Sequence, residues 1–306
     1  MLFDVIIIGG GPAGLTAGLY TSRAKLKSLL IEKAIPGGQV VTTGWVENYP
    51  GFDEGISGPD LSLKMEKQAK NFGLETVHGA VSGIALQGKI KRVTLDDGTL
   101  FEAKALIITT GANPKPLNID GEEKYRGKGV SYCATCDGAF FKGKKIAVIG
   151  GGDAAVEEAI FLTRFASEVY MVHRRDKLRA TKIIQERAMA NQKIKFVCDS
   201  VVEKIEGDDT VNSISLKDVK TGQKTKLYVE GVFIYVGYNP NTEFLKGLID
   251  MNKDGYIVTD DRMATSVHGV FAAGDVRAKL LKQIATAVGD GATAAVAVEK
   301  YIEESF

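Results

Sequence analysis

Short apolar runs, some of them β-branched and closed by glycines, recur along the chain and alternate with helix-like stretches. The first run, residues 4–8 (DVIII), leads into residues 9–14 (GGGPAG), and a helix-like stretch follows over residues 15–25. A second apolar run covers residues 28–31 and ends at Glu32. Apolar runs of this length, without polar alternation, are typical of parallel strands that are buried on both faces. The pattern predicts strand, turn, helix and strand, which is the start of an α/β fold.

The turn at residues 9–14 has the G-x-G-x-x-G spacing of a dinucleotide-binding loop. Its glycines let the backbone approach a pyrophosphate, and the following helix start offers unpaired N–H groups and a positive dipole end. Glu32 closes the second strand, where a carboxylate accepts hydrogen bonds from ribose hydroxyls. A purely structural glycine turn is the alternative, but the complete strand–helix–strand context favours a nucleotide. The predicted contacts are Gly9, Gly11, Pro12, Ala13, Gly14 and Glu32.

The same pattern occurs a second time. Residues 145–149 (KIAVI) read as a strand, residues 150–155 (GGGDAA) as a G-x-G-x-x-A turn, and a helix over 154–165 and a strand over 168–172 follow. The spacing from Gly9 to Glu32 is 23 residues, and the spacing from Gly150 to His173 is also 23. We interpret the chain as carrying two copies of one nucleotide-binding unit.

The two copies differ where the second strand ends. Glu32 in the first copy favours a free 2′-hydroxyl and repels a 2′-phosphate. His173 takes its place in the second copy, and three arginines follow, whose guanidinium groups bind phosphate oxygens in pairs. A solvated basic patch is the alternative. We predict NADPH on the second copy, with Gly150, Gly152, Asp153, Ala155, His173, Arg174, Arg175 and Arg179 as its contacts.

A third marker is residues 269–275 (GVFAAGD), which read as a strand ending in Gly-Asp before an alanine-rich helix over 283–304. This places Asp275 at the carboxyl end of a strand, where doubly wound sheets bind ligands. A plain strand-to-helix turn explains the same residues, so this marker alone decides nothing.

Cys133 and Cys136 form a C-x-x-C pair in residues 131–141 (SYCATCDGAFF). A zinc site needs further ligands, and Cys198 and the histidines His78, His173 and His268 form no second pair. A redox-active disulfide is therefore favoured over zinc, and over two inert packed cysteines. Cys198 lies in the alternating pattern KIKFVCD and is predicted to be a buried thiol without chemistry.

The residues after the dithiol have two interpretations each. Asp137 either caps a helix that begins after the dithiol or donates a proton to a leaving thiolate, and its position slightly favours the acid role. Phe140 and Phe141 are adjacent and cannot both face inward on a regular strand. One of them is a candidate anchor for a protein partner.

Composition and net charge bear on the classes of partner and on the cellular compartment, but they do not identify a partner. The 39 basic and 38 acidic residues nearly cancel, so no large field favours nucleic acid or a membrane surface. Three cysteines in 306 residues argue for a reducing compartment, and we predict a cytoplasmic protein. The first residues (MLFDVIIIGGG) read as a strand and not as a signal peptide, and no apolar run reaches the roughly 18 residues of a membrane span.

Taken together, the motifs resemble the low-molecular-weight bacterial-type thioredoxin reductases along the whole chain. The resemblance rests on GGGPAGLTA, GGQVVTTGWVENYPG, TTGA, CATCDG, GGGDAAVEEA, HRRDKLRA, VGYNPNT and GVFAAGDV. It implies FAD on the first copy, NADPH on the second, a Cys133–Cys136 redox disulfide, the acid role for Asp137, thioredoxin as protein substrate and a homodimer. The flavin contacts that it implies in these stretches are Gly38, Gln39, Asn48, Gly111, Gly274, Asp275 and Gln283. Lys282 departs from the family, which more often has arginine there; lysine lacks the bidentate fork.

The order of the motifs predicts the architecture. We expect two Rossmann-like, doubly wound, three-layer α/β domains, the second inserted into a discontinuous first. Residues 1–114 and 243–306 would form the FAD domain, and residues 115–242 the NADPH domain with the disulfide. Prolines and glycines at both crossings (Pro114, Pro116, Gly237 and Pro240) suit a hinge.

The predicted activity is reduction of thioredoxin by NADPH through FAD and the disulfide. Nicotinamide and dithiol lie on one domain, and both must reach the flavin, so we expect that domain to rotate. The alternatives are a reductase for another small dithiol or a peroxiredoxin-linked partner, a ferredoxin-driven relative, and a flavin-bound redox sensor without turnover. The basic cluster argues against the ferredoxin-driven relative.

Overall fold

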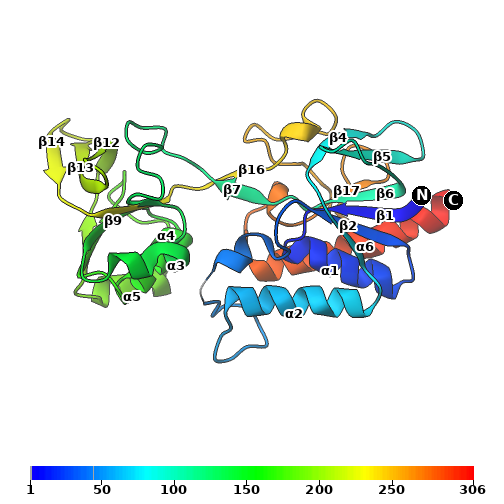
Figure 1. Ribbon diagram of the computed structural model, residues 1–306, viewed down its shortest axis with the longest axis horizontal. Coiled ribbons are helices and arrows are strands. Elements are labelled where there is room, and N and C mark those ends of the chain that lie inside the picture. The colour runs from blue at the N-terminus through cyan, green and yellow to red at the C-terminus, as the bar shows by residue number, and fades with distance from the viewer. Residues whose placement is uncertain (1, 44) are drawn as a thin grey trace. The chain divides into compact units, whose positions relative to one another are not determined.

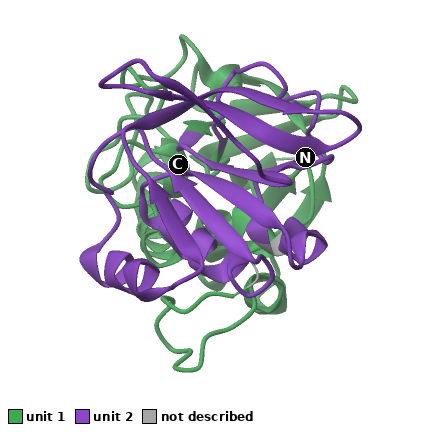
Figure 2. Cartoon of the chain, turned by 90° about the vertical axis from the view of Figure 1, so that its left-hand side faces the viewer, with its two compact units in different colours: residues 1–113, 239–306 green, residues 114–238 purple. Residues whose placement is uncertain are grey.

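The computed structural model describes residues 2–43 and 45–306, with all their side chains except those of Thr135 and Cys136. The chain forms two compact units: unit 1 holds residues 1–113 and 239–306, and unit 2 holds residues 114–238 (Figure 2). Unit 2 is thus an insertion, and the chain crosses between the units twice. The crossings run through β7 (Ala112–Pro114) and β16 (Tyr238–Pro240), which pair with each other.

Unit 1 is built on a seven-stranded sheet in the order β3-β2-β1-β6-β5-β4, with β17 paired to the second half of β6. The parallel strands are β1 (Leu2–Ile8), β2 (Ser28–Glu32), β3 (Glu75–His78), β6 (Leu100–Ile108) and β17 (Val270–Ala272). The antiparallel strands are β4 (Val81–Ala85) and β5 (Lys91–Leu95). Helices α1 (Pro12–Arg23), α2 (Gly58–Asn71) and α6 (Ile284–Ser305) cover one face of the sheet (Figure 1). Short 3₁₀ turns are η1 (Gly38–Thr42), η3 (Glu243–Leu245) and η4 (Gly274–Val276).

Strand β1 explains why the first apolar run has no polar alternation. Val5 and Ile7 pack into the core beneath the helices, whereas Ile6 and Ile8 pack into a second core with Leu245 on the opposite face. Because successive side chains point to opposite faces of a strand, a strand buried on both faces requires an apolar residue at every position.

Unit 2 has three layers. Its central sheet is parallel, in the order β11-β10-β9-β15-β8, and a three-stranded antiparallel sheet, β12-β13-β14, packs on one face. The strands are β8 (Val130–Ser131), β9 (Lys145–Gly150), β10 (Glu168–Val172), β11 (Ile194–Val197), β12 (Ser200–Gly207), β13 (Val211–Asp218), β14 (Lys224–Leu227) and β15 (Gly231–Tyr235). The helices are α3 (Ala134–Asp137), α4 (Asp153–Leu162) and α5 (Lys182–Ala190), and η2 (Gly138–Phe141) follows α3. The fold class predicted from the sequence, with one α/β fold inserted into another, is confirmed.

Two predicted boundaries need correction, and a third is refined. The first helix begins at Pro12 rather than at residue 15, since proline suits the first helical position. The last strand ends at Ala272, because Gly274 adopts φ +81° and turns the chain into η4, so Asp275 lies in a 3₁₀ turn and not on the strand. The helix expected after the dithiol is the short 3₁₀ helix η2, and a further helical turn, α3, already begins at Ala134 between the two cysteines.

Candidate redox site with two dinucleotide-binding loops

The first glycine loop follows β1, and two of its glycines have no room for a side chain. A Cβ on Gly14 would lie 1.9 Å from the carbonyl oxygen of Gly9 and 2.8 Å from Oγ1 of Thr109. Gly9 adopts φ +107°, in the region that favours glycine. Helix α1 then begins at Pro12 without a side-chain cap, so the first-turn N–H groups are left for a ligand.

Glu32, at the end of β2, has two hydrogen-bond partners within the protein. Its Oε2 accepts a bond from the backbone N–H of Gly10 at 2.6 Å, and its Oε1 accepts one from Ala34 at 2.9 Å. The Glu32 carboxylate therefore stabilises the glycine loop through a direct hydrogen bond to Gly10. Its predicted contact with ribose remains a prediction.

The structure brings two more of the predicted flavin residues, Gly38 and Gly274, to the same loop. A Cβ on Gly38 would lie 3.1 Å from Cα of Gly11, and a Cβ on Gly274 would lie 2.8 Å from Cβ of Ala13. Gln39 follows Gly38 in η1, and Gly111, at φ +65°, lies two residues after Thr109. The amide of Asn48 donates to Oε1 of Gln283 at 3.0 Å, although 235 residues separate them.

Asp275 is the strongest indication of a bound group in unit 1. Its Oδ1 is buried and has no hydrogen-bond partner in the part of the chain that the structure describes. Burial raises the pKa of this carboxyl, although Lys279 and Lys282 oppose that shift. A buried acceptor without a donor is costly, so the site fits a ligand that carries hydroxyl groups, as the ribityl chain of FAD does.

Sequence reasoning missed the residues that hold the Asp275 turn. Asp290 of α6 accepts a bond from the backbone N–H of Gly274 at 3.0 Å. The same carboxylate pairs with Nη1 of Arg277 at 2.9 Å and Nζ of Lys279 at 2.7 Å, and the three side chains are 10–13% exposed. In the sequence, only the basic residues Arg277 and Lys279, shortly after the Gly-Asp pair, pointed to this ion-pair network.

Lys282 has a defined partner in this structure. Its Nζ lies 3.7 Å from the centroid of the Tyr256 ring, and burial lowers the pKa of the amine. A compact ammonium over an aromatic face is a favourable cation–π contact that needs no bidentate fork.

The second glycine loop has the same geometry as the first. Ile149 of β9 pairs with Val172 of β10 as Ile8 pairs with Ile31, so His173 and Glu32 follow equivalent strand positions. A Cβ on Gly150 would lie 2.3 Å from the carbonyl oxygen of Tyr235. Helix α4 begins at Asp153, directly after Gly152 and without a side-chain cap, and Ala155 packs against the loop.

The basic segment is fastened to this second loop. The backbone N–H groups of Arg179 and Ala180 donate to the carbonyl oxygen of Gly151 at 2.6 and 3.1 Å. Oδ1 of Asp153 accepts a bond from the backbone N–H of Thr181 at 2.6 Å. The side chains of the three predicted arginines are exposed beside the loop: Arg174, Arg175 and Arg179.

His173 lies beneath these arginines. It is 6% exposed, and its Nε2 has no hydrogen-bond partner among the described residues. Burial, followed by the charge of Arg179, lowers the pKa of the imidazole. An orphaned ring nitrogen within a cationic cluster fits an anionic ligand such as the 2′-phosphate of NADPH.

The dithiol segment lies at the start of α3. Cys133 is disulfide-bonded and half-buried, whereas the side chain of Cys136 lies outside the described residues. The backbone N–H of Cys133 donates to Oγ of Ser131 at 3.0 Å, and that of Ala134 donates to the hydroxyl of Tyr235 at 2.7 Å. The backbone around Cys133 is therefore fixed on both sides.

Two predictions around the dithiol can be refined. Asp137 precedes η2 but makes no side-chain cap hydrogen bond there, and its acid role stays a prediction. Cys198 is a free thiol that is half-buried and not fully buried, because it lies one residue beyond β11, and burial raises its pKa. A raised thiol pKa disfavours the reactive thiolate.

Phe140 and Phe141 divide as the sequence predicts. Phe140 is 74% exposed, whereas Phe141 is 7% exposed and packs edge-on against Phe233 at 5.2 Å between ring centroids. One member of the pair therefore serves the core, and the other is presented to solvent.

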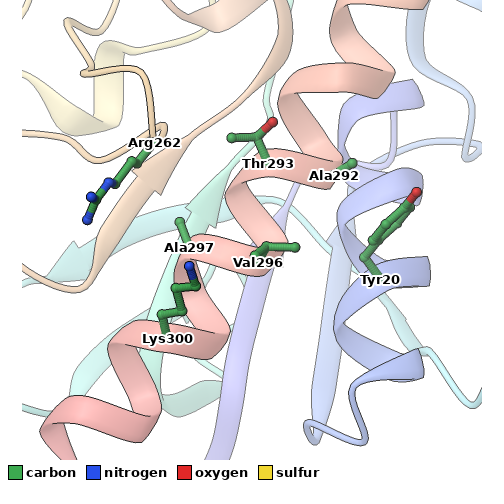
Figure 3. A pocket seen from close by; sticks show the side chains of 7 residues that line it. All are labelled: Tyr20, Arg262, Ala292, Thr293, Val296, Ala297 and Lys300. Atoms are coloured by element: carbon green, nitrogen blue, oxygen red, sulfur yellow. The ribbon is translucent and has the colours of Figure 1, made fainter.

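A hollow of about 420 Å³ lies elsewhere in unit 1, between α1 and α6 (Figure 3). Its lining residues are Tyr20, Arg262, Ala292, Thr293, Val296, Ala297 and Lys300. None of the predicted site residues is among them. In residues 2–43 and 45–306 we find no group of three or more His, Cys, Asp or Glu side chains suited to a metal ion, and no helix there is long and apolar enough to cross a membrane.

Comparison with known proteins accounts for this combination of loops and cysteines. A sequence model of the family described as pyridine nucleotide-disulphide oxidoreductase matches residues 3–291. The chain is 51% identical to a thioredoxin reductase of Bacillus subtilis over 304 residues, which cover 99% of this chain and 96% of the relative. A Listeria innocua thioredoxin reductase is 52% identical and is covered to 95% of its length, with 99% of this chain.

A solved structure gives the same result. The thioredoxin reductase of Lactococcus lactis superposes with a TM-score of 0.96 at 51% identity, with 99% of each chain covered. The chain therefore belongs to the pyridine nucleotide-disulphide oxidoreductases, in the branch formed by the thioredoxin reductases.

Proposed function

We propose that the chain is a flavoprotein reductase that passes electrons from NADPH through FAD and a Cys133–Cys136 disulfide to oxidised thioredoxin. The observation that carries the proposal is the occurrence of two dinucleotide loops in one chain, with disulfide-bonded Cys133 in the unit of the second loop. The Bacillus, Listeria and Lactococcus relatives are all thioredoxin reductases, at about half of all positions identical over nearly the full chain.

The cofactors assigned to the two units are FAD and NADPH. FAD would lie against Gly9, Gly11, Gly14 and Gly274, with the orphaned Oδ1 of Asp275 as an acceptor for its hydroxyls. NADPH would lie on the second loop, with the basic cluster at its 2′-phosphate. Bound flavin supplies the two-electron chemistry with a nicotinamide that no amino-acid side chain performs.

The dithiol would act by exchange. A thiolate of the reduced pair attacks the thioredoxin disulfide and forms a mixed disulfide, and the second cysteine of the pair then displaces thioredoxin. The pair ends as a disulfide, and thioredoxin leaves with two thiols. The carboxyl of Asp137 would supply the proton that a leaving thiolate takes up. Phe140, exposed four residues beyond Cys136, would be the apolar contact for thioredoxin.

The biological setting is also a proposal. Three cysteines in 306 residues support a cytoplasmic location, where a reducing pool keeps thiols such as Cys198 reduced. Membership of the family supports a homodimer, which light scattering after gel filtration would test directly. The two paired crossing strands, β7 and β16, are proposed as the hinge on which unit 2 rotates.

The test is an anaerobic reductive titration of the FAD-loaded protein. A flavin and a disulfide each accept two electrons, so the unmodified protein should take about two equivalents of dithionite, and Cys133→Ser about one. NADPH should reduce the flavin in both proteins, but only the unmodified one should then reduce added thioredoxin. Cys198→Ser is the matched control and should behave as the unmodified protein does. A single equivalent in the unmodified protein, or an inactive Cys198→Ser, would refute the proposal.

A further inference from the structure

Glu122 is a buried carboxylate with an unusually complete set of donors. Its residue is 4% exposed, and it lies in the loop by which the chain enters unit 2. Its Oε1 accepts bonds from the backbone N–H of Leu117 at 2.8 Å and from the hydroxyl of Tyr132 at 2.5 Å. Its Oε2 accepts a bond from the backbone N–H of Asn118 at 2.6 Å. The Glu122 carboxylate thus links the loop at residues 117–118, where the chain enters unit 2, to Tyr132.

Tyr132 is held in two ways. Its hydroxyl is bound to Glu122, and the guanidinium of Arg126 lies 5.3 Å from its ring centroid. Arg126 is paired in turn with Glu123 at 3.6 Å. Burial, and then the neighbouring Glu122 carboxylate, raise the pKa of the Tyr132 phenol, so it stays a hydrogen-bond donor at every physiological pH.

Tyr132 immediately precedes Cys133. The backbone of residues 131–134 is held by Ser131 at the N–H of Cys133 and by Tyr235 at the N–H of Ala134. A third anchor is the Glu122–Tyr132 bond. Of the three, it alone connects this segment to the loop at residues 117–119, outside the sheet. Cys133 consequently lies on a backbone that has little freedom to move when its disulfide opens.

We propose that Glu122 and Tyr132 are positioning residues for the dithiol, which hold Cys133 in the place required for its disulfide to close again. This inference rests on the proposed function, since it takes Cys133 to be half of a redox-active pair. Both residues act through the backbone of Cys133, which Tyr132 directly precedes in the chain.

The physical consequence concerns the reduced state. A disulfide keeps its two sulfurs together by itself, but after reduction only the surrounding structure does so. A fixed Cys133 raises the effective concentration of one thiol at the other, which favours the disulfide. Loosening the anchor should favour the dithiol form and make the pair a stronger oxidant.

The test compares two tyrosines of unit 2. Tyr132→Phe removes one hydroxyl and leaves the Glu122 carboxylate with its backbone donors. Tyr125→Phe is the control: Tyr125 is buried, whereas Tyr132 is half-buried, and the Tyr125 hydroxyl donates to the carbonyl oxygen of Gly207, away from the dithiol. The full-length FAD-loaded proteins are equilibrated in glutathione buffers of graded potential, and the oxidised fraction of Cys133 is read by alkylation and mass.

Only the part of the bond energy that differs between the disulfide and dithiol forms shifts their equilibrium. Loss of one hydrogen bond of ordinary net strength in Tyr132→Phe should therefore shift the equilibrium toward the dithiol by up to about fivefold, which is about 20 mV for a two-electron couple. Tyr125→Phe should lower thermal stability to a similar extent without this shift. If both variants shift equally, or neither does, the inference is wrong. If Cys133 of the unmodified protein does not exchange with glutathione at all, the proposed function itself is wrong.

A second pair of variants tests the carboxylate. Glu122→Gln places an amide N–H₂ among backbone N–H donors and should shift the equilibrium at least as far as Tyr132→Phe. Glu230→Gln removes the same charge at an exposed position elsewhere in unit 2 and should leave the equilibrium unchanged. If Glu122→Gln fails to fold, the comparison of Tyr132→Phe with Tyr125→Phe alone tests the inference. An equal shift in Glu230→Gln would attribute the effect to charge and refute positioning.

Discussion

The imidazole of His173 lies against Gly151 as the carboxylate of Glu32 lies against Gly10. A Cβ on Gly151 would come within 2.5 Å of Nδ1 of His173, and a Cβ on Gly10 would come within 3.2 Å of Oε2 of Glu32. Each side chain therefore closes over its own glycine loop. The two copies share one geometry and differ in charge, so this position and its neighbours should decide which nucleotide each loop accepts.

The first prediction concerns that choice. Replacing Arg174 and Arg175 together with glutamine should lower kcat/KM for NADPH about a hundredfold, since two screened charge-assisted bonds contribute roughly 3 kcal/mol. Use of NADH and the FAD content should change little. Rates with both nicotinamides at low and high salt give the answer.

The matched control for the arginines is Lys224→Gln with Lys226→Gln. These lysines belong to the same unit but pair with Glu203 and Glu206 on the antiparallel sheet. The double lysine variant should keep its preference for NADPH. Equal use of NADH and NADPH by the unmodified protein would show that Arg174 and Arg175 do not recognise the 2′-phosphate and are only surface charges.

The second prediction concerns Asp137. Because its side chain caps no helix turn, Asp137→Asn should leave thermal stability unchanged. It should slow thioredoxin reduction at least severalfold while flavin reduction by NADPH keeps its rate, since only the exchange step needs a proton donor. Stopped-flow traces at the flavin band separate the two steps. Normal turnover together with a lower melting temperature would assign Asp137 a structural role instead.

The third prediction is a pH dependence of stability that arises at Glu158 of α4. Burial, aided by the charge of Glu157, raises the pKa of Glu158 from 4.5 to about 7. The folded protein thus keeps a proton that the unfolded chain releases. The resulting stabilisation is full below about pH 4.5, declines as the pH rises, and is lost above about pH 7.

Glu158→Gln should therefore match the unmodified protein near pH 4 and exceed its stability at pH 8, by at most about 3 kcal/mol. Urea unfolding at both pH values, followed by circular dichroism, measures the difference. Glu186→Gln, at an exposed position of α5, is the control and should show no gain at pH 8. A gain that is equal at both pH values would exclude titration of Glu158 as its cause.

The fourth prediction compares two glycines of α6. A Cβ on Gly291 would lie 2.3 Å from the carbonyl oxygen of Ala13, whereas nothing lies within 4 Å of a Cβ on Gly289. Gly291→Ala should push α6 away from α1, cost about 1–3 kcal/mol and lower the temperature at which FAD is released. Gly289→Ala should stabilise the helix by up to about 1 kcal/mol. Flavin fluorescence during heating measures the temperature of FAD release in both variants. Similar release temperatures would show that the close approach of Gly291 to Ala13 does not contribute to stability.

Local patterns were sufficient for much of the site. The glycine loops need only a strand, a tight turn and a helix start that follow one another in the chain, and the 23-residue spacing sets Glu32 and His173 in register. The division of Phe140 and Phe141 between solvent and core follows from their being adjacent. Such features depend on neighbours in sequence, so backbone periodicity is enough to predict them.

Other features depend on segments that are distant in sequence. The bond from Asn48 to Gln283 spans 235 residues, and the Asp290 carboxylate meets Gly274, Arg277 and Lys279 only because α6 packs beside the last strand. No sequence pattern marks Glu122 as buried, and only the fold gives it its donors. The interpretation of Asp137 as a helix cap has no side-chain cap hydrogen bond to support it. The predicted burial of Cys198 is only partial, because Cys198 lies one residue beyond β11.

The sequence by itself therefore determined the two nucleotide loops, their difference in charge and the dithiol, because each is a short pattern whose chemistry is carried by its own residues. The tertiary structure alone decided which polar groups are buried, which are paired and which are left without a partner. Burial and pairing arise from packing between distant segments, and they fix the orphaned Asp275 and His173 atoms and the anchoring of Cys133 through Glu122.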